Sequence, residues 1–407
     1  MNFALEFRHV DILFAQNRAA QRNLDAARQA LHAGSSRADV TKQFGVVAGI
    51  VDANLGVVSG EIAVMMGLSG SGKSTLLRAA NRLNRISSGE VRLLDGSTTI
   101  DVASCSVAEL RRVRRQRIAM VFQQFGLLPW RSVRDNVGFG LELRGDSPAE
   151  RKQRVDEKLE LVGLTQWADR SVGELSGGMQ QRVGLARAFA TDADILLMDE
   201  PFSALDPLIR TRLQDELLAL QARVRKTILF VTHDLDEALR IGNQISILEG
   251  GRIVQTGQPR DIVLQPANDY VAAFVQHMNM LTMLTGELVM RPAAHCQRED
   301  RTYWLDPERR FRVDTDPAGN LVGASSSDGE LTIQGPTVTD AAGSGRSIGA
   351  VPCQTSLQTI ITLANATQKP VVVTENGRFL GVCGPTEIVA ALDRSRASSA
   401  ASASTPK

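Results

Sequence analysis

Residues 67–75 carry the run Gly-Leu-Ser-Gly-Ser-Gly-Lys-Ser-Thr, which constrains the fold more than any other feature of the chain. A polyphosphate needs several backbone N–H groups that converge on its oxygens, and only a glycine-rich turn lets the main chain approach that closely. The short apolar run at 61–66 before it suits a buried parallel strand, and residues 74–83 after it have helical spacing. This order of strand, loop and helix predicts an α/β fold with a phosphate-binding loop, and argues against a chance glycine-rich turn.

We call residues 67–75 the phosphate loop. All of its residues are candidate nucleotide ligands: Gly67, Leu68, Ser69, Gly70, Ser71, Gly72, Lys73, Ser74 and Thr75. Lys73 is expected to reach the β- and γ-phosphates as a point charge, and Ser74 to bind Mg²⁺ through its hydroxyl. The N-terminus of the following helix adds a partial positive charge. The cofactors predicted from this segment are therefore ATP and Mg²⁺.

A second apolar run, residues 195–198, is followed by Asp199 and Glu200. Open α/β sheets bind ligands at the carboxyl ends of their strands, so we expect Asp199 to hold Mg²⁺ and Glu200 to polarise the attacking water. An acidic pair at the end of a strand is often only a turn cap. The phosphate loop upstream favours the catalytic interpretation.

Residues 175–182 read Leu-Ser-Gly-Gly-Met-Gln-Gln-Arg, and we call them the Ser-Gly-Gly segment. A helix that starts with Ser-Gly-Gly presents an anion-binding surface, and no second phosphate chain is expected near it in its own subunit. A phosphate held by another subunit would fill this surface.

With these motifs in this order, the chain resembles the ATP-binding cassette (ABC) proteins from about residue 46 to residue 277. The resemblance implies a RecA-like core, an antiparallel β subdomain and a helical subdomain, with two chains sandwiching two ATP molecules. It also implies that one chain closes the site of the other through Ser176, Gly177, Gly178 and Gln180.

Four more residues acquire roles through the same resemblance. Gln123 would contact Mg²⁺ and the attacking water, His233 the γ-phosphate, and Asp206 would belong to a loop that reaches across the dimer. Phe14 is the nearest candidate for the aromatic that stacks on adenine, although an aromatic at a strand end is more often a core residue. Taken alone, the histidine is more often a hydrogen-bonded strand end and the glutamine a solvated loop residue.

Composition limits the partners. Lys and Arg number 46 against 45 Asp and Glu, a net charge of +1, so no overall field favours nucleic acid. No stretch has the apolar length of a membrane span, and the N-terminus lacks the features of a secretory signal. The cysteines, Cys105, Cys296, Cys353 and Cys383, are scattered and suit a reducing cytoplasm. An ATPase of this kind that moves a solute would take its pore from other subunits.

The chain is long enough for a large α/β domain and a second module. We expect an ATP-binding domain at 1–278 with a helical insertion at 15–45, a regulatory domain at 279–394, and a disordered Ala- and Ser-rich tail at 395–407. The helix, strand, turn, strand and helix predicted over residues 356–393 resemble a cystathionine-β-synthase-type (CBS) domain. Residues 279 to about 345 would be a degenerate first copy, giving a small α+β CBS-like module. A dimerising scaffold without a sensing function is the alternative.

This architecture resembles the ATPase subunit of importers of glycine betaine, proline and choline, and leans to the choline branch. The resemblance implies a homodimer, integral-membrane permease subunits and an extracytoplasmic solute-binding protein, with the chain peripheral on the cytoplasmic face of the membrane. The segment around Trp130 would receive a helix of the permease, with an ordinary core turn as the alternative. The rival function is a nucleic-acid-linked ABC switch, which the single uninterrupted cassette disfavours.

Overall fold

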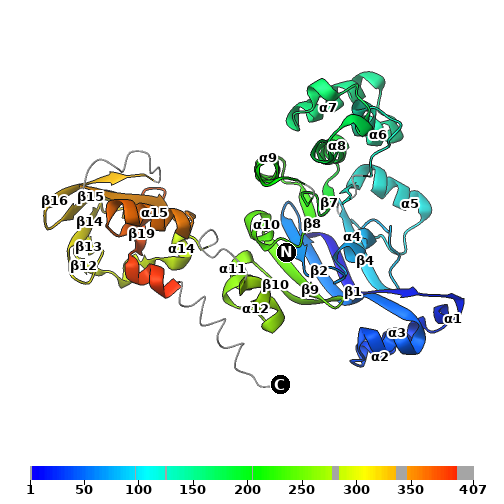
Figure 1. The fold of residues 1–407 in the computed structure, drawn as a ribbon, viewed down its shortest axis with the longest axis horizontal. Coiled ribbons are helices and arrows are strands. Elements are labelled where there is room, and N and C mark those ends of the chain that lie inside the picture. Colours follow the sequence, from blue (N-terminus) through cyan, green and yellow to red (C-terminus); the bar gives the residue numbers. More distant parts are fainter. Residues whose placement is uncertain are drawn as a thin grey trace. The chain divides into compact units, whose positions relative to one another are not determined.

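The computed structural model describes residues 2–96, 98–123, 126–203, 205–276, 284–335 and 346–391. The chain divides into two compact units, residues 1–271 and 272–407 (Figure 1). The predicted boundary at 278 and the predicted tail lie outside the described residues. Among the described residues, no helix combines the length and the apolar character that a membrane crossing requires.

The first unit is built on a six-stranded sheet with the order β10-β9-β3-β8-β7-β6. Its strands are β3 (Ile62–Met66), β6 (Ile118–Val121), β7 (Ile195–Asp199), β8 (Thr227–Val231), β9 (Gln244–Glu249) and β10 (Arg252–Gly257). All pairs are parallel except β9 with β10. Every residue of β3, β7 and β8 is buried, which is why these strands are continuous apolar runs in the sequence. The α/β fold predicted from the sequence is confirmed.

A second sheet, with the order β2-β1-β4-β5, is antiparallel. It consists of β1 (Phe3–Ala15), β2 (Val46–Val58), β4 (Ser88–Asp95) and β5 (Thr98–Asp101). One cluster of buried side chains includes Leu5 and Ile50 from this sheet and Met65 and Leu197 from the parallel sheet. The two sheets therefore share a hydrophobic core.

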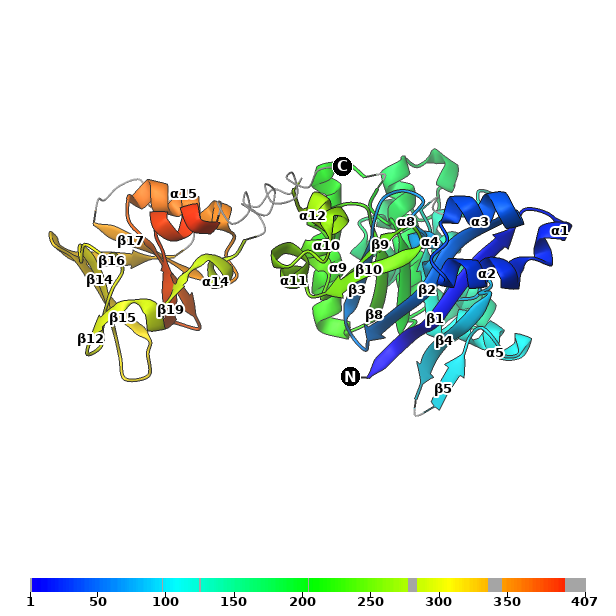
Figure 2. The ribbon, with the colours of Figure 1, turned by 90° about the horizontal axis from the view of Figure 1, so that it is seen from below.

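The helical insertion between β1 and β2 contains three helices, α1 (Arg18–Gln21), α2 (Leu24–His32) and α3 (Arg37–Phe44) (Figure 2). The helical path of the insertion is interrupted between Gln21 and Leu24. A second interruption separates α2 from α3, and Ser36 caps α3 there.

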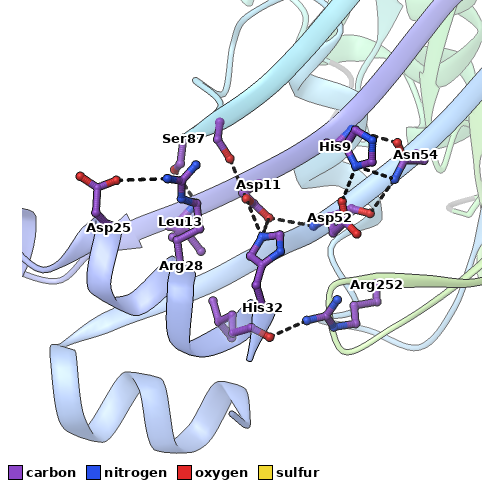
Figure 3. A network of polar contacts seen from close by, with 12 residues as sticks. His9, Asp11, Leu13, Asp25, Arg28, His32, Asp52, Asn54, Ser87 and Arg252 are labelled. Atoms are coloured by element: carbon purple, nitrogen blue, oxygen red, sulfur yellow. Dashed lines mark hydrogen bonds and ion pairs between the residues drawn. The ribbon is translucent and has the colours of Figure 1, made fainter. Parts of the chain in front are cut away.

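A buried carboxylate, Asp11 of β1, anchors this insertion (Figure 3). Its oxygens accept hydrogen bonds from Ser88 Oγ at 2.6 Å and from the Asp52 backbone N–H at 2.8 Å, and lie 3.0 Å from His32 Nε2 at the end of α2. Burial by itself raises the pKa of Asp11, but these bonds outweigh burial and hold the pKa below its ordinary value.

Three helices pack into a separate cluster, the helical group: α6 (Val133–Arg144), α7 (Pro148–Leu161) and α8 (Gly177–Ala190). Figure 1 shows the helical group and the insertion at different ends of the first unit.

The other α-helices described in the first unit are α4 (Lys73–Ala79), α5 (Val107–Arg112), α9 (Pro207–Val224), α10 (Leu235–Ile241), α11 (Pro259–Leu264) and α12 (Asp269–Gln276), which runs past residue 271. The predicted helix over 74–83 was too long, because Arg82 adopts a left-handed φ of 57° that ends the helical path.

The second unit contains a nine-stranded sheet with the order β11-β19-β18-β17-β16-β15-β14-β13-β12. Its strands are β11 (Arg291–Pro292), β12 (Gln297–Glu299), β13 (Thr302–Trp304), β14 (Phe311–Thr315), β15 (Leu321–Ser326), β16 (Gly329–Gln334), β17 (Ser347–Pro352), β18 (Val371–Glu375) and β19 (Arg378–Cys383). Among the described residues of this unit, the helical segments beside the sheet include α14 (Gly286–Val289), α15 (Leu357–Thr367) and residues 385–391.

The helix and hairpin predicted at 356–383 are confirmed as α15, β18 and β19. The described residues at 284–335 form short strands with only α14 and a short 3₁₀ turn as helices. A degenerate first CBS copy in this half stays a prediction.

Replacing Asp11 by Asn is expected to lower the free energy of unfolding at pH 7 by about 2 kcal/mol, because hydrogen bonds to a buried charge are lost. A carboxylate whose folded pKa is depressed stabilises the fold above its unfolded pKa, about 3.9, and this contribution disappears as the pH falls through the folded value. The difference in the free energy of unfolding between the native chain and the Asp11→Asn variant should therefore vanish in acid. Urea denaturation at a series of pH values measures it.

The matched control is Asp25→Asn, because Asp25 is an exposed carboxylate on the same insertion. It should change stability by no more than about 0.5 kcal/mol. An equal loss in both variants would contradict the anchoring role of Asp11.

Candidate active site

The phosphate loop joins β3 to α4, and its neighbours leave room only for glycine at two positions. Gly67 has a φ of 150°, and a Cβ there would lie 2.2 Å from the Leu248 carbonyl oxygen. Gly72 has a φ of 103°, and its Cβ would lie 2.5 Å from the Gly49 carbonyl oxygen. The loop is thus pressed between β2 and the end of β9, which fixes the direction of its backbone N–H groups.

Lys73 lies buried at the start of α4. Its Nζ donates to the carbonyl oxygens of Gly67 at 2.8 Å and Leu68 at 3.0 Å. Burial lowers the pKa of Lys73, and the charges of Glu200 and Asp199 oppose that shift. The buried hydroxyl of Ser71 has no hydrogen-bond partner among the described residues. A polyphosphate would give the ammonium and this hydroxyl anionic acceptors.

Ser74 and Asp199 meet where α4 begins and β7 ends. Ser74 Oγ donates to Asp199 Oδ1 at 2.6 Å, and Arg78 Nη2 donates to Asp199 Oδ2 at 3.0 Å. Asp199 is fully buried, so its charge requires such partners. A hydroxyl and a carboxylate oxygen this close are the hard ligands that Mg²⁺ takes together with phosphate oxygens, so these residues fit the ion.

Glu200 follows Asp199 and turns away from the strand. Its φ is 46°, and its backbone N–H donates to the Val231 carbonyl at 3.0 Å. Its Oε2 lies 3.3 Å from Gln123 Nε2 and 3.1 Å from His233 Nδ1. These three side chains follow β6, β7 and β8, so the adjacent strand ends bring the three predicted catalytic residues together. A carboxylate held by two flanking groups can orient a water molecule.

Phe14, at the end of β1, is 43 % exposed. A Cβ added to Gly49 would lie 2.9 Å from Phe14 Cε2. It would also lie 3.1 Å from Thr75 Cγ2, so both side chains border the same point. Phe14 therefore lies on the surface beside the first turn of α4, as an aromatic near the nucleotide would. Stacking on adenine stays a prediction.

The Ser-Gly-Gly segment starts α8 within the helical group. Ser176 caps the helix by accepting the Met179 N–H at 3.4 Å, and its position is exposed. The Gln180 amide donates to carbonyls of its own chain, Val172 at 3.1 Å and Leu175 at 3.2 Å. Gly177 is exposed, and Gly178 is so close to Leu205 that a Cβ there would lie 3.2 Å from Leu205 Cδ2.

Asp206 is exposed and caps α9 by accepting the Ile209 N–H at 3.0 Å. Its neighbour Ala204 lies outside the described residues. The contacts across a dimer that the sequence implies for Ser176, Gly177, Gly178, Gln180 and Asp206 stay predictions.

Comparison with known proteins agrees with this geometry. A family model described as ABC transporter matches residues 50–203. The chain is 42 % identical over 375 residues to the glycine betaine/proline betaine transport system ATP-binding protein ProV of Escherichia coli, covering 89 % of this chain and 92 % of that protein. The chain belongs to the ATP-binding proteins of ABC transporters.

Two further comparisons support the assignment of this ABC ATPase. It is 42 % identical over 384 residues to the glycine betaine/carnitine transport ATP-binding protein GbuA of Listeria monocytogenes, covering 90 % of this chain and 93 % of that protein. The dimeric structure of a post-hydrolysis state of the ATP-binding cassette MJ0796, bound to ADP and Pi, superposes with a TM-score of 0.53 at 30 % identity, covering 63 % of this chain and 99 % of that one. The chain is therefore an enzyme that binds and hydrolyses ATP.

Sequence reasoning missed two residues of the ABC ATPase that contact this site. Arg78 neutralises Asp199, and the Tyr270 hydroxyl accepts the Leu68 backbone N–H at 3.2 Å. The helical position of Arg78, one turn after Ser74, could have indicated its contact. Nothing local in the sequence connects Tyr270 to a loop 202 residues away.

Glu200→Gln is expected to lower the turnover of ATP by at least about a hundredfold, because an amide cannot take a proton from the attacking water. ATP binding should stay within about twofold, since no hydrogen bond or ion pair joins Glu200 to the phosphate loop among the described residues. Phosphate release and equilibrium titration with ATP measure the two quantities.

Glu249→Gln is the control, because Glu249 is an exposed carboxylate at the end of β9 in the same sheet. It should hydrolyse ATP as the native chain does. Undiminished hydrolysis by the Glu200 variant would remove Glu200 from this role.

Proposed function

We propose that this chain is the ATP-hydrolysing subunit of an importer for quaternary ammonium compounds and energises uptake through a partner permease. ATP hydrolysis is supported by one observation: Lys73, Ser74, Asp199 and Glu200 lie together at one edge of the parallel sheet. The role in an importer is supported by the relatives. Their similarity extends well past residues 50–203, and their names specify glycine betaine, proline betaine or carnitine.

In this proposal the phosphate loop binds ATP, and each nearby side chain has one task. Lys73 exchanges its two carbonyl acceptors for β- and γ-phosphate oxygens. Ser74, Asp199 and Gln123 hold Mg²⁺, which supplies charge neutralisation at the phosphates when bound. Glu200 orients the attacking water, His233 contacts the γ-phosphate, and Phe14 stacks on adenine.

The working unit in this proposal is a homodimer. The exposed Ser176 and Gly177 of one chain would cover the γ-phosphate held by the other, with Gly178, Gln180 and Asp206 at the same interface. The N-terminus of a helix favours an anion, and Ser176 and Gly177 at the start of α8 are exposed. Closure on ATP and opening after hydrolysis would then move the permease.

The partners follow from this role. Integral-membrane permease subunits would bind the chain at the cytoplasmic face of the membrane, and an extracytoplasmic solute-binding protein would deliver the solute. Trp130 is 77 % exposed, which excludes a core position and leaves it available to a permease helix. A nucleic-acid-linked switch is not favoured, because both named relatives are transport proteins.

The solute itself is chosen among several quaternary ammonium compounds. The relatives name glycine betaine, proline betaine and carnitine, whereas the resemblance of the sequence leans to choline. These compounds share a quaternary ammonium group and differ in the carboxylate that choline lacks.

The test is reconstitution of the chain with its permease and solute-binding protein in lipid vesicles. ATP hydrolysis and uptake should rise with glycine betaine, proline betaine, carnitine or choline and not with a neutral sugar, and the Glu200→Gln complex should transport nothing. The order of half-maximal concentrations separates choline from the betaines. Stimulation by none of the quaternary compounds would refute the proposed solute class.

The second unit is proposed to regulate transport by sensing ionic strength or an anionic membrane surface. Deleting residues 279–407 should change the dependence of uptake on osmolarity while the remaining chain still hydrolyses ATP. Deleting only residues 395–407 is the control and should leave that dependence unchanged. Identical uptake by the native and shortened chains at every osmolarity would favour a scaffold without a sensing function.

A further inference from the structure

Arg37, the first residue of α3, lies against the phosphate loop. Its Nη1 lies 3.4 Å from the Gly70 carbonyl oxygen, and its side chain is half-buried. Gly70 has a φ of 78°, and a Cβ there would meet nothing within 4 Å. The loop is therefore open beside this contact, and a residue of the helical insertion stands next to the opening.

The charge of Arg37 is not balanced locally. Its contact with Gly70 is long and involves a neutral acceptor, and no carboxylate within the described part of the chain forms an ion pair with it. Arg28, on the same insertion, does have an acidic partner, Asp25, at 3.6 Å. An unpaired guanidinium next to a loop that binds a triphosphate creates a local positive potential at the site of an anion.

The insertion holds Arg37 at a fixed place. Leu31 of α2 and Val40 of α3 are buried together with Leu13 and Val51 of the antiparallel sheet. The contact of Asp11 with His32 Nε2, at 3.0 Å, fixes the end of α2 only a few residues before Arg37. The backbone around Arg37 is thus positioned by packing and by a buried polar network.

A second connection joins the same region to the phosphate loop. Arg252 Nη2 donates to the Leu31 carbonyl at 2.8 Å, as Figure 3 shows for Arg252 beside the end of α2. The adjacent Gly251 N–H donates to the Ser71 carbonyl at 3.1 Å. The turn between β9 and β10 therefore contacts both the insertion and the loop, which fixes the distance between them.

We propose that Arg37 binds the phosphate chain of the nucleotide, so that the helical insertion forms part of the nucleotide site. Rotation of its side chain replaces one long bond to a neutral carbonyl with charge-assisted bonds to phosphate oxygens, which are stronger. This inference rests on ATP binding at the phosphate loop and not on the identity of the solute.

The test uses the full chain and titrates it with ATP and with ADP. Arg37→Gln is expected to raise the dissociation constant about tenfold and to make it less dependent on salt concentration. At saturating ATP the turnover should stay within about twofold, so that KM changes and kcat does not. Arg37→Lys keeps the charge and should recover part of the affinity.

Arg28→Gln is the matched control, since it removes one charge from the same insertion away from the loop. Its nucleotide affinity should equal that of the native chain. The proposal is overturned if Arg37→Gln binds ATP with native affinity and native salt dependence, or if Arg28→Gln loses as much affinity.

Two measurements distinguish a failure of the role proposed for Arg37 from a failure of nucleotide binding by the phosphate loop. Lys73→Ala should lose nucleotide binding whatever Arg37 does, and retained binding in that variant would count against the phosphate loop itself. Thermal unfolding without nucleotide should be unchanged in Arg37→Gln. If that variant melts earlier and Arg37→Lys recovers no affinity, Arg37 is structural and the proposal fails.

Discussion

The active site depends on the contact between the β3–α4 turn and the carboxyl end of β7. Ser74 reaches Asp199 at 2.6 Å, and Arg78 pairs with the other oxygen of the same fully buried carboxylate. A buried charge is tolerated only when it is paired, so these contacts hold the loop and the strand end together. Ser74 and Asp199 would hold Mg²⁺ through these same atoms, which would couple nucleotide binding to the position of the loop.

Two candidate anion-binding surfaces lie on different parts of the first unit. The phosphate loop and Glu200 lie on the parallel sheet, whereas the exposed helix start at Ser176 belongs to the separate helical group. The dimeric MJ0796 cassette shows that a related domain assembles in pairs. The proposed homodimer makes both anion-binding surfaces act on one nucleotide.

The parallel strands, and the position of Asp199 and Glu200 at the end of one of them, could be predicted because each depends on local sequence. Residues 227–231 and 195–199 are continuous apolar runs, and such runs occur where a strand is buried on both faces. The early end of α4 could not be predicted, since it depends on the left-handed backbone of Arg82. The contact of Arg37 with Gly70 arises from packing of the insertion on the sheet, and no local pattern encodes it.

The central claim is that each hydrolytic site combines the phosphate loop of one chain with Ser176 of the other. Mixing Lys73→Ala chains with Ser176→Arg chains tests it most directly, because each variant by itself should be inactive. A mixed dimer pairs the intact phosphate loop of the Ser176 variant with the intact Ser176 of the Lys73 variant, and hydrolysis should return in the mixture. A mixture as inactive as its two components would contradict a shared site.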